Sequence, residues 1–134
     1  MIYLASPYSS PHEEVREARY KEALSFVASH LENSFVYSPI VYYHQVAKYN
    51  KSATDAETWR RQNHDALALA EKVYVLVIDG TEHSEGVIAE VHLACILFKQ
   101  VTYWLTTTLN PQEAHERVDA VRKIVEGEFY DRNS

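Results

Sequence analysis

Short apolar runs alternate with longer amphipathic stretches along the chain. This alternation is typical of a parallel β-sheet covered by α-helices. The run VYVLVI is the most continuous of the short ones, as expected for a strand that is buried on both faces. The pattern predicts strands over residues 2–5, 35–38, 73–78 and 101–105.

The predicted helices begin with recognisable capping sequences. In SPHE, residues 10–13, a capping serine precedes a first-turn proline and a capping-box glutamate, and 54–57 (TDAE) and 110–113 (NPQE) repeat the arrangement. Together with the periodicity, these signals predict helices over 11–32, 55–71 and 111–126, the last ending at Gly127, and a fourth helix over 86–98. The predicted buried stripe of the first helix is Tyr20, Leu24, Val27 and Leu31.

These elements predict a single domain over residues 1–134. The expected fold is α/β: a flavodoxin-like (Rossmann-like) three-layer sandwich with a central parallel sheet of four or five strands. In such sheets, ligands bind beyond the carboxyl ends of the strands, where the strand order reverses. Three predicted loops are therefore candidates for a site: 6–10 (SPYSS), 39–44 (PIVYYH) and 79–86 (DGTEHSEG).

Composition narrows the classes of function. A net charge of −6 argues against binding to a nucleic-acid polymer, which needs a basic face. No apolar run approaches 18 residues, and the one cysteine, Cys95, suits a reducing compartment. We therefore expect a cytoplasmic protein without membrane association, in which Cys95 is a small buried apolar residue. The histidines show no metal-ligand spacing, so we expect no metal and no cofactor.

Three carboxylates are candidates for catalysis. Glu90 lies four residues after Gly86, early in the predicted fourth helix, where the helix dipole favours an ionised carboxylate. Such a carboxylate can act as a nucleophile, or it can simply complement the dipole. Asp79 and Asp65 can share proton transfer and positioning with it. Alternatively, Asp79 is a turn residue before Gly80, and Asp65 is a solvated helix position.

Polar and aromatic residues near the same loops are candidates for ligand binding. Ser84 precedes a helix N-terminus that suits a phosphate, although a plain helix cap has the same sequence. The segment SPYSS precedes another helix N-terminus, and the nearby arginines can pair with a phosphate, with a carboxylate or with surface groups. Aromatic side chains can stack on a base or serve packing alone. The candidate binding residues are Ser6, Pro7, Tyr8, Ser9, Arg16, Arg19, His44, Trp59, Gly80, Ser84 and Gly86.

Four stretches, taken in order, resemble the nucleoside 2-deoxyribosyltransferase-like superfamily. The closest likeness is to a small bacterial and phage branch of the DUF1937 type, with further similarity to 2′-deoxynucleoside 5′-monophosphate N-glycosidases. The stretches are IYLASPYSSPHEEVREARY at 2–20, SPI at 38–40, WRRQNHDALALAEKVYVLVIDG at 59–80 and SEGVIAEVHLA at 84–94. The resemblance implies a flavodoxin-like fold and cleavage or exchange of an N-glycosidic bond.

The resemblance also implies roles for individual residues. Glu90 in GVIAE matches the nucleophile, Asp65 matches an aspartate that contacts substrate and assists base protonation, and Tyr3 matches a tyrosine that positions the nucleophile. Ser84 stands six residues before Glu90, as a serine does in the enzymes that hydrolyse monophosphates. The first loop, SPYSS, departs from their pattern of a glycine-containing segment with an arginine. Homo-oligomers, dimers or tetramers, are implied as well.

We therefore expect an N-glycosidase that cleaves the base from a (deoxy)nucleoside 5′-monophosphate. Glu90 attacks C1′, the base leaves with a proton routed through Asp65 or Asp79, and water resolves the glycosyl ester. One alternative is a deoxyribosyltransferase, which passes the sugar to a second base. Another is a non-catalytic protein that binds a nucleotide or a nucleotide-derived signal in the same pocket.

Overall fold

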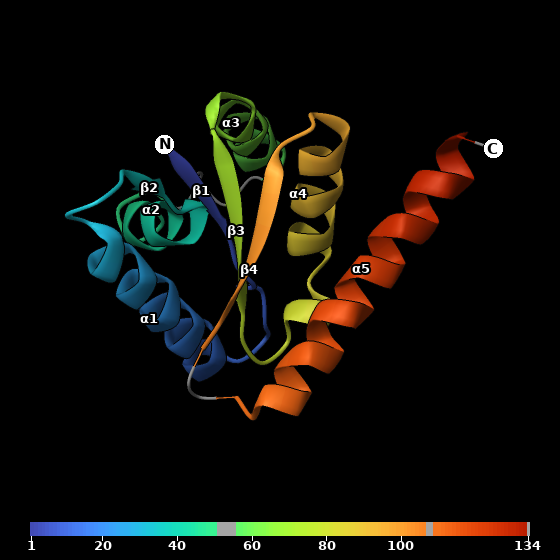
Figure 1. The fold of residues 1–134 in the computed structure, drawn as a ribbon. Coiled ribbons are helices and arrows are strands. Elements are labelled where there is room, and N and C mark those ends of the chain that lie inside the picture. Colours follow the sequence, from blue (N-terminus) through green and yellow to red (C-terminus); the bar gives the residue numbers. More distant parts are fainter. Residues whose placement is uncertain (51–55, 107–108, 134) are drawn as a thin grey trace.

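The computed structural model describes residues 1–50, 56–106 and 109–133. Within them, four strands form a parallel sheet in the order β2-β1-β3-β4 (Figure 1). Helices flank the sheet on both sides, which confirms the predicted three-layer, flavodoxin-like α/β arrangement. The strands are β1 (Ile2–Ala5), β2 (Val36–Tyr37), β3 (Lys72–Val77) and β4 (Gln100–Leu105).

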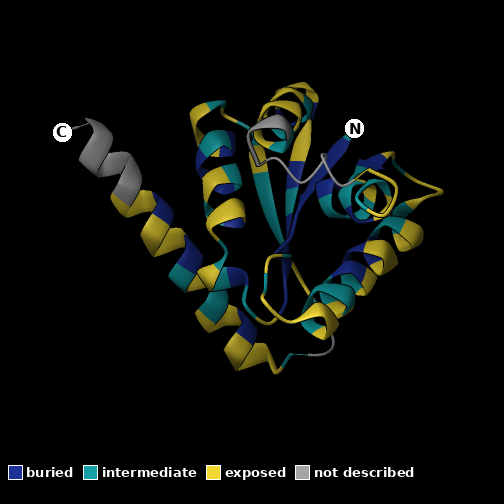
Figure 2. Cartoon of the chain, turned by 180° about the vertical axis from the view of Figure 1, so that it is seen from behind, coloured by how far each residue is buried: buried dark blue, intermediate teal, exposed yellow. Residues whose placement is uncertain are grey.

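The side chains of the central strands alternate between the two faces of the sheet. Tyr3 and Ala5 of β1 pack in a core cluster with residues of α3, α4 and α5, whereas Ile2 and Leu4 pack in a second cluster with α1. Figure 2 shows that burial is concentrated in the middle of the sheet, between partly exposed helices, where β1 and β3 lie. The helices are α1 (Glu13–His30), α2 (Pro39–Val46), α3 (Ala56–Leu69), the 3₁₀ helix η2 (Thr81–His83), α4 (Glu85–Ile96) and α5 (Pro111–Asn133).

The beginnings of the helices differ in part from prediction. The first helix begins at Glu13 and not at residue 11, because the Ser10 hydroxyl accepts a hydrogen bond from His12 N (3.2 Å) in the turn before the helix. Asn110 does cap α5, since its side chain accepts from Gln112 N at 2.8 Å. The cap predicted at Thr54 lies outside the described residues.

A short helix, α2, was not predicted. Residues 39–44 were expected to form a loop, but they begin a helix that Ser38 caps by accepting a hydrogen bond from Val41 N at 3.1 Å. Pro39 occupies the first turn, which is the arrangement seen at other helix starts. With only eight residues, this helix has too few turns to show a clear apolar period.

The buried stripe of α1 also differs from prediction. Tyr20 is buried as expected, but Leu24 and Leu31 are 40% and 72% exposed. Ala23 and Phe26 replace them, because they are the positions that α1 turns toward the β1 and β3 side chains of the second core cluster. The spacing of apolar residues therefore predicted the buried face to within about one residue. It wrongly placed Leu24 in the core, where the neighbouring Ala23 lies.

The last helix continues past its predicted stop. Gly127 lies inside α5, which runs to Asn133. Glycine ends a helix mainly by adopting a left-handed conformation, and the glycine with positive φ among the described residues is Gly80, not Gly127. Cys95, which was expected to be buried, lies exposed on α4.

The order of the strands determines where a ligand can bind. The chain leaves β1 toward β2 on one side and leaves β3 toward β4 on the other, so the strand order reverses between β1 and β3. The carboxyl ends of these two strands therefore diverge into loops that run to opposite sides. This edge carries two of the three loops that the sequence indicated, 6–10 and 79–86.

Candidate functional site

A cleft of about 820 Å³ opens at the carboxyl ends of β1 and β3. It is lined by the β1–α1 loop, the start of α2, the segment between β3 and α4, and single side chains from other helices, among them Asn63 and Arg117. Its position is the one that the topology predicts. The predicted site residues that line it are Ser6, Tyr8, Ser9, Arg19, Asp79, Gly80, Ser84, Gly86 and Glu90.

Glu90 presents a carboxylate with an unusual environment. It lies in the second turn of α4, and its Oε2 is fully buried. Burial raises its pKa to about 7, and the nearby Tyr3 hydroxyl lowers it only in part. The expected preference for the ionised form is thus not met, because the dipole acts mainly in the first turn of a helix. Near neutral pH, both the ionised and the protonated form of the carboxylate are therefore populated.

Tyr3 lies beside Glu90 and is completely buried. Its pKa is strongly raised, first by burial and then by the Glu90 charge. The two groups approach each other without reaching hydrogen-bond geometry, since Tyr3 OH and Glu90 Oε2 both lack a partner among the described residues. The structure therefore places Tyr3 next to the carboxylate that it was predicted to position, behind the wall of the cleft.

Several buried polar atoms at this edge lack partners. Besides Tyr3 OH and Glu90 Oε2, Ser6 Oγ makes no hydrogen bond within the described part of the chain, although Ser6 is only 5% exposed and lines the cleft. Buried polar groups in native proteins are almost always hydrogen-bonded, to protein, to water or to a ligand. Their clustering at one cleft is what a site for a polar ligand requires.

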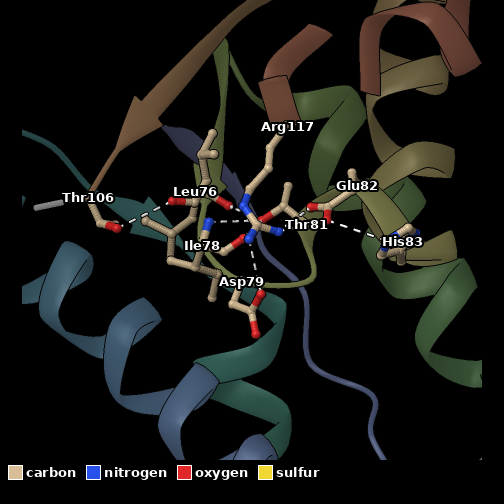
Figure 3. A network of polar contacts seen from close by, with 9 residues as sticks. Leu76, Ile78, Asp79, Thr81, Glu82, His83, Thr106 and Arg117 are labelled. Carbon is tan, nitrogen blue, oxygen red and sulfur yellow. Dashed lines mark hydrogen bonds and ion pairs between the residues drawn. The ribbon is translucent and has the colours of Figure 1, made fainter. Parts of the chain in front are cut away.

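Arg117 of α5 clamps the segment between β3 and α4 (Figure 3). Its Nη1 donates to both carboxylate oxygens of Glu82, at 2.6 and 2.9 Å, and its Nη2 lies 3.2 Å from Asp79 Oδ1. Burial acts to raise the pKa of Glu82, but a backbone hydrogen bond and the Arg117 guanidinium outweigh it and lower the pKa. Asp79 is otherwise turned to solvent, with 90% of its side chain exposed.

The turn after β3 is fixed by Thr81 and Gly80. Thr81 Oγ1 accepts from Ile78 N (2.9 Å) and lies within donating distance of the Leu76 and Ile78 carbonyls, at 3.0 and 2.9 Å (Figure 3). Gly80 has a φ of 92°, and a Cβ at this position would lie 2.2 Å from Arg19 Nη2. Only glycine meets both the conformation and the close approach of the arginine.

The N-terminus of α4 and Arg19 provide the donors of the cleft. Ser84 caps the helix by accepting from Val87 N at 3.2 Å, so the predicted cap is present and the hydroxyl hydrogen is still available to donate. Arg19 Nη1 donates to the Ser9 carbonyl at 2.8 Å and thereby ties α1 to the loop after β1. Serine hydroxyls, a helix N-terminus and a guanidinium are the groups that bind phosphates in proteins.

The structure does not bring Asp65 to the cleft. Its side chain is 76% exposed, and its Oδ1 lies 3.9 Å from His64 Nδ1. Asn63 lines the cleft instead. Two residues along an α-helix correspond to a rotation of about 200°, so both side chains cannot face the same side. The predicted role of Asp65 in the helix before β3 is therefore not supported by its position.

Arg16 and Pro7 also lie outside the wall of the cleft. Arg16 Nη1 donates to the Ser10 carbonyl at 2.5 Å, which fixes the β1–α1 loop. Pro7, in the same loop, is fully buried. Both residues therefore shape the segment that presents Ser6, Tyr8 and Ser9 to the cleft.

The predicted aromatic residues serve packing. Trp59 meets the rings of Tyr42 and Tyr43 edge-on, with centroid distances of 5.7 and 4.7 Å, and so joins α2 to α3. His44 is buried behind Tyr8, whose hydroxyl lies 2.9 Å from His44 Nδ1. Neither Trp59 nor His44 lines the cleft.

Sequence reasoning missed several residues that line the cleft. Pro39 and Ile40 belong to the unpredicted helix α2, and Asn63 stands two positions from the aspartate that was chosen. Arg117 is one of several charged residues on α5, and no local motif distinguishes it. Only the packing of α5 against η2 reveals its role.

The described residues carry few other signs of specialised chemistry. Among them, no three His, Cys, Asp or Glu side chains gather in a way that would hold a metal ion. The described helices also include none that is long and apolar enough to cross a membrane.

Fold and site together define a flavodoxin-like α/β protein with a polar cleft at the reversal of strand order. The family model of a domain of unknown function, DUF1937, matches residues 1–106, and the chain belongs to this family. A search of curated proteins gives no match. The matched region includes every residue of the cleft wall except Arg117, which α5 contributes from beyond it.

Proposed function

We propose that the protein is an N-glycosidase that cleaves the base from a (deoxy)nucleoside 5′-monophosphate. The observation that carries the proposal is Glu90: a carboxylate at the wall of a cleft large enough for a nucleotide, whose Oε2 is buried without a hydrogen-bond partner in the described structure. Attack on C1′ of a sugar needs a carboxylate that is held in place, is largely shielded from water and can still ionise near neutral pH.

The lining of the cleft offers groups for both parts of a nucleotide. From α2 and α3, Pro39, Ile40 and Asn63 offer apolar contact for a flat base and an amide to hydrogen-bond with its edge. Ser84 at the α4 N-terminus and Arg19 of α1 offer donors for a phosphate. Glu90 lines the same cleft, which suits attack on the sugar that joins them.

Charge also bears on the phosphate. The cleft wall carries the carboxylates of Asp79, Glu82, Glu85 and Glu90. Arg117 pairs with two of them, which reduces the negative field that a phosphate would meet. Among the described residues, Arg19 contacts backbone carbonyls and pairs with no carboxylate, so its charge remains available to an anion. We therefore assign phosphate recognition to Arg19 and not to Arg117.

The reaction proceeds in two displacements. A Glu90 oxygen forms a bond to C1′ while the bond between C1′ and the base breaks, with Tyr3 beside the carboxylate to hold it. Water then attacks C1′, and Glu90 leaves as a carboxylate. Two inversions give net retention at C1′. The products are the free base and the sugar 5-phosphate.

The test is chromatography of nucleosides and their 5′-monophosphates after incubation with wild-type protein and with Glu90→Gln. Free base released from a monophosphate by the wild type alone supports the proposal. If a new nucleoside forms only when a second base is added, the protein is a transferase. If all substrates survive, while one of them raises the melting temperature of both proteins equally, the protein is a binder and the proposal fails. Light scattering of the same samples tests the expected homo-oligomer.

A further inference from the structure

His44 is a buried titratable residue to which the reaction above gives no role. It is 9% exposed, and its ring stacks on Tyr20 with the centroids 4.0 Å apart and the planes 17° apart. Gln45 Nε2 donates to the Tyr20 hydroxyl at 2.5 Å, which fixes the stack between α1 and α2. The imidazole is therefore held in one place directly behind the cleft.

Both nitrogens of this ring face groups that can exchange protons. Nδ1 lies 2.9 Å from the hydroxyl of Tyr8, which lines the cleft, and Nε2 lies 3.0 Å from Glu17 Oε2. The contact with Glu17 misses hydrogen-bond geometry, so Nε2 has no hydrogen-bond partner among the described residues. A carboxylate so close favours a proton on Nε2. Tyr8, His44 and Glu17 thus form a chain from the cleft to a side chain that is 42% exposed.

We propose that Tyr8 is the catalytic acid that protonates the departing base, and that His44 and Glu17 resupply its proton. The inference rests on the proposed function and names a residue for protonation of the departing base, a step to which no residue was assigned above. The two donors expected from sequence are poorly placed for it. Asp65 lies outside the cleft, and Asp79 pairs with Arg117, where an ionised carboxylate can only accept.

Each step conserves protons and electrons. In the starting state, His44 carries protons on both nitrogens, Nδ1–H donates to the Tyr8 oxygen, and the Tyr8 hydroxyl points at the base. When the bond to C1′ breaks, its electron pair stays on the base, which takes the Tyr8 proton, and Tyr8 takes the Nδ1 proton. His44 is left neutral beside Glu17. The water that later attacks C1′ returns a proton through Tyr8 to His44.

The surroundings of Tyr8 suit this role. Burial raises its pKa, Arg16 opposes that rise, and Tyr43 and Glu17 add to it. Tyr8 therefore keeps its proton in the resting protein and gives it up only when a basic nitrogen develops in front of it. A general acid works best when it is matched to its leaving group in this way.

The experiment compares two substrates that differ in their need for a proton. One is 2′-deoxyguanosine 5′-monophosphate, and the other is its N7-methylated form, whose cationic base leaves unprotonated. For a protein that prefers pyrimidines, the pair is the uracil nucleotide and its 5-fluoro form, which has the better leaving group. Tyr8→Phe is expected to slow the ordinary substrate on the order of 100-fold and to leave the activated one nearly unchanged.

Control variants separate the relay from packing. Glu17→Gln keeps the half-exposed side chain and is expected to show the same substrate dependence with a smaller loss in kcat and little change in KM. Tyr42→Phe removes a hydroxyl from the same helix as His44, outside the chain of contacts, and should behave as wild type. Circular dichroism and the melting temperature verify that each variant folds.

The outcomes distinguish the two proposals. If Tyr8→Phe slows both substrates equally while Glu90→Gln is inactive, the glycosidase stands and the relay is wrong. If Tyr8→Phe slows neither substrate, the relay is also wrong. If the wild type cleaves neither substrate nor any other nucleotide, the proposed function fails and the relay falls with it.

Discussion

Two glutamates of the cleft, eight residues apart in sequence, have opposite surroundings. Glu82 accepts two hydrogen bonds from Arg117, and its pKa is lowered. Oε2 of Glu90 is buried without a hydrogen-bond partner in the described structure, and the pKa of Glu90 is raised to about 7. A paired carboxylate such as Glu82 holds its loop in place, whereas an unpaired buried oxygen can gain a hydrogen bond from a ligand. The contrast separates the structural carboxylate from the one that we propose to be the nucleophile.

The largest expected effect comes from replacing Glu90, the proposed nucleophile. Glu90→Gln should lower turnover by at least about a thousandfold, because an amide neither attacks C1′ nor leaves from it. Glu82→Gln should lose far less activity, since it only loosens the loop. Initial rates at saturating substrate, measured beside melting curves, make the comparison. Equal losses in the two variants would contradict the division of roles.

The pH dependence of turnover tests the raised pKa of Glu90. For the substrate whose base leaves unprotonated, and which therefore needs no proton donor, turnover should rise as the pH increases through about 7, because the proposed nucleophile must be ionised. A profile of kcat against pH for the wild type, flat across this range, would argue against Glu90 as the nucleophile.

Stability should depend on pH in the opposite direction at this residue. The folded protein holds the Glu90 proton more tightly than the unfolded chain, with a pKa of about 7 against 4.5. Its stabilising contribution is therefore complete below pH 4.5 and is lost as the pH rises through 7. The shift corresponds to a change on the order of 3 kcal/mol in the free energy of unfolding. Urea unfolding at several pH values should show this slope in the wild type and not in Glu90→Gln.

Removing the clamp tests the satisfied carboxylate. Arg117→Ala should lower the free energy of unfolding by about 2 kcal/mol, because it leaves Glu82 in a partly buried position without its guanidinium. The variant should also lose stability less steeply toward acid, since the lowered pKa of Glu82 contributes stability that disappears as the pH falls. Lys123→Ala, at an exposed position of the same helix, is the matched control. Identical unfolding curves for the two variants would show that the clamp contributes nothing.

The smallest expected effect concerns Gly80, in the turn just before Glu82. Gly80→Ala should cost about 1 to 2 kcal/mol, because alanine resists a φ of 92° and its Cβ displaces Arg19. Gly127→Ala is the control: Gly127 is helical with open space around it, so alanine there should stabilise by about 0.5 to 1 kcal/mol. Thermal melts of both variants decide whether the loop needs its left-handed residue.

The edge of the sheet that carries the cleft could be predicted from sequence, but the residues that α2, α3 and α5 contribute to the walls of the cleft could not. Short apolar runs between amphipathic stretches predicted the strands, and therefore the edge whose cleft Ser6 and Glu90 line. Sequence reasoning named Asp65 and not Asn63, because which of the two faces the cleft depends on the rotation of one helix. The raised pKa of Glu90 depends on burial, which sequence spacing does not measure.

The position of Arg117 allows the wall of the cleft to be changed from a helix that carries none of the proposed catalytic residues. The strands and the Glu90 helix lie within residues 1–106, whereas this arginine reaches the cleft from a helix outside that region. Substitutions of Arg117 therefore change one wall of the cleft without altering the residues proposed for chemistry. For an engineer, the molecule offers one position on a separate helix at which the wall of the cleft can be varied while the proposed catalytic residues stay unchanged.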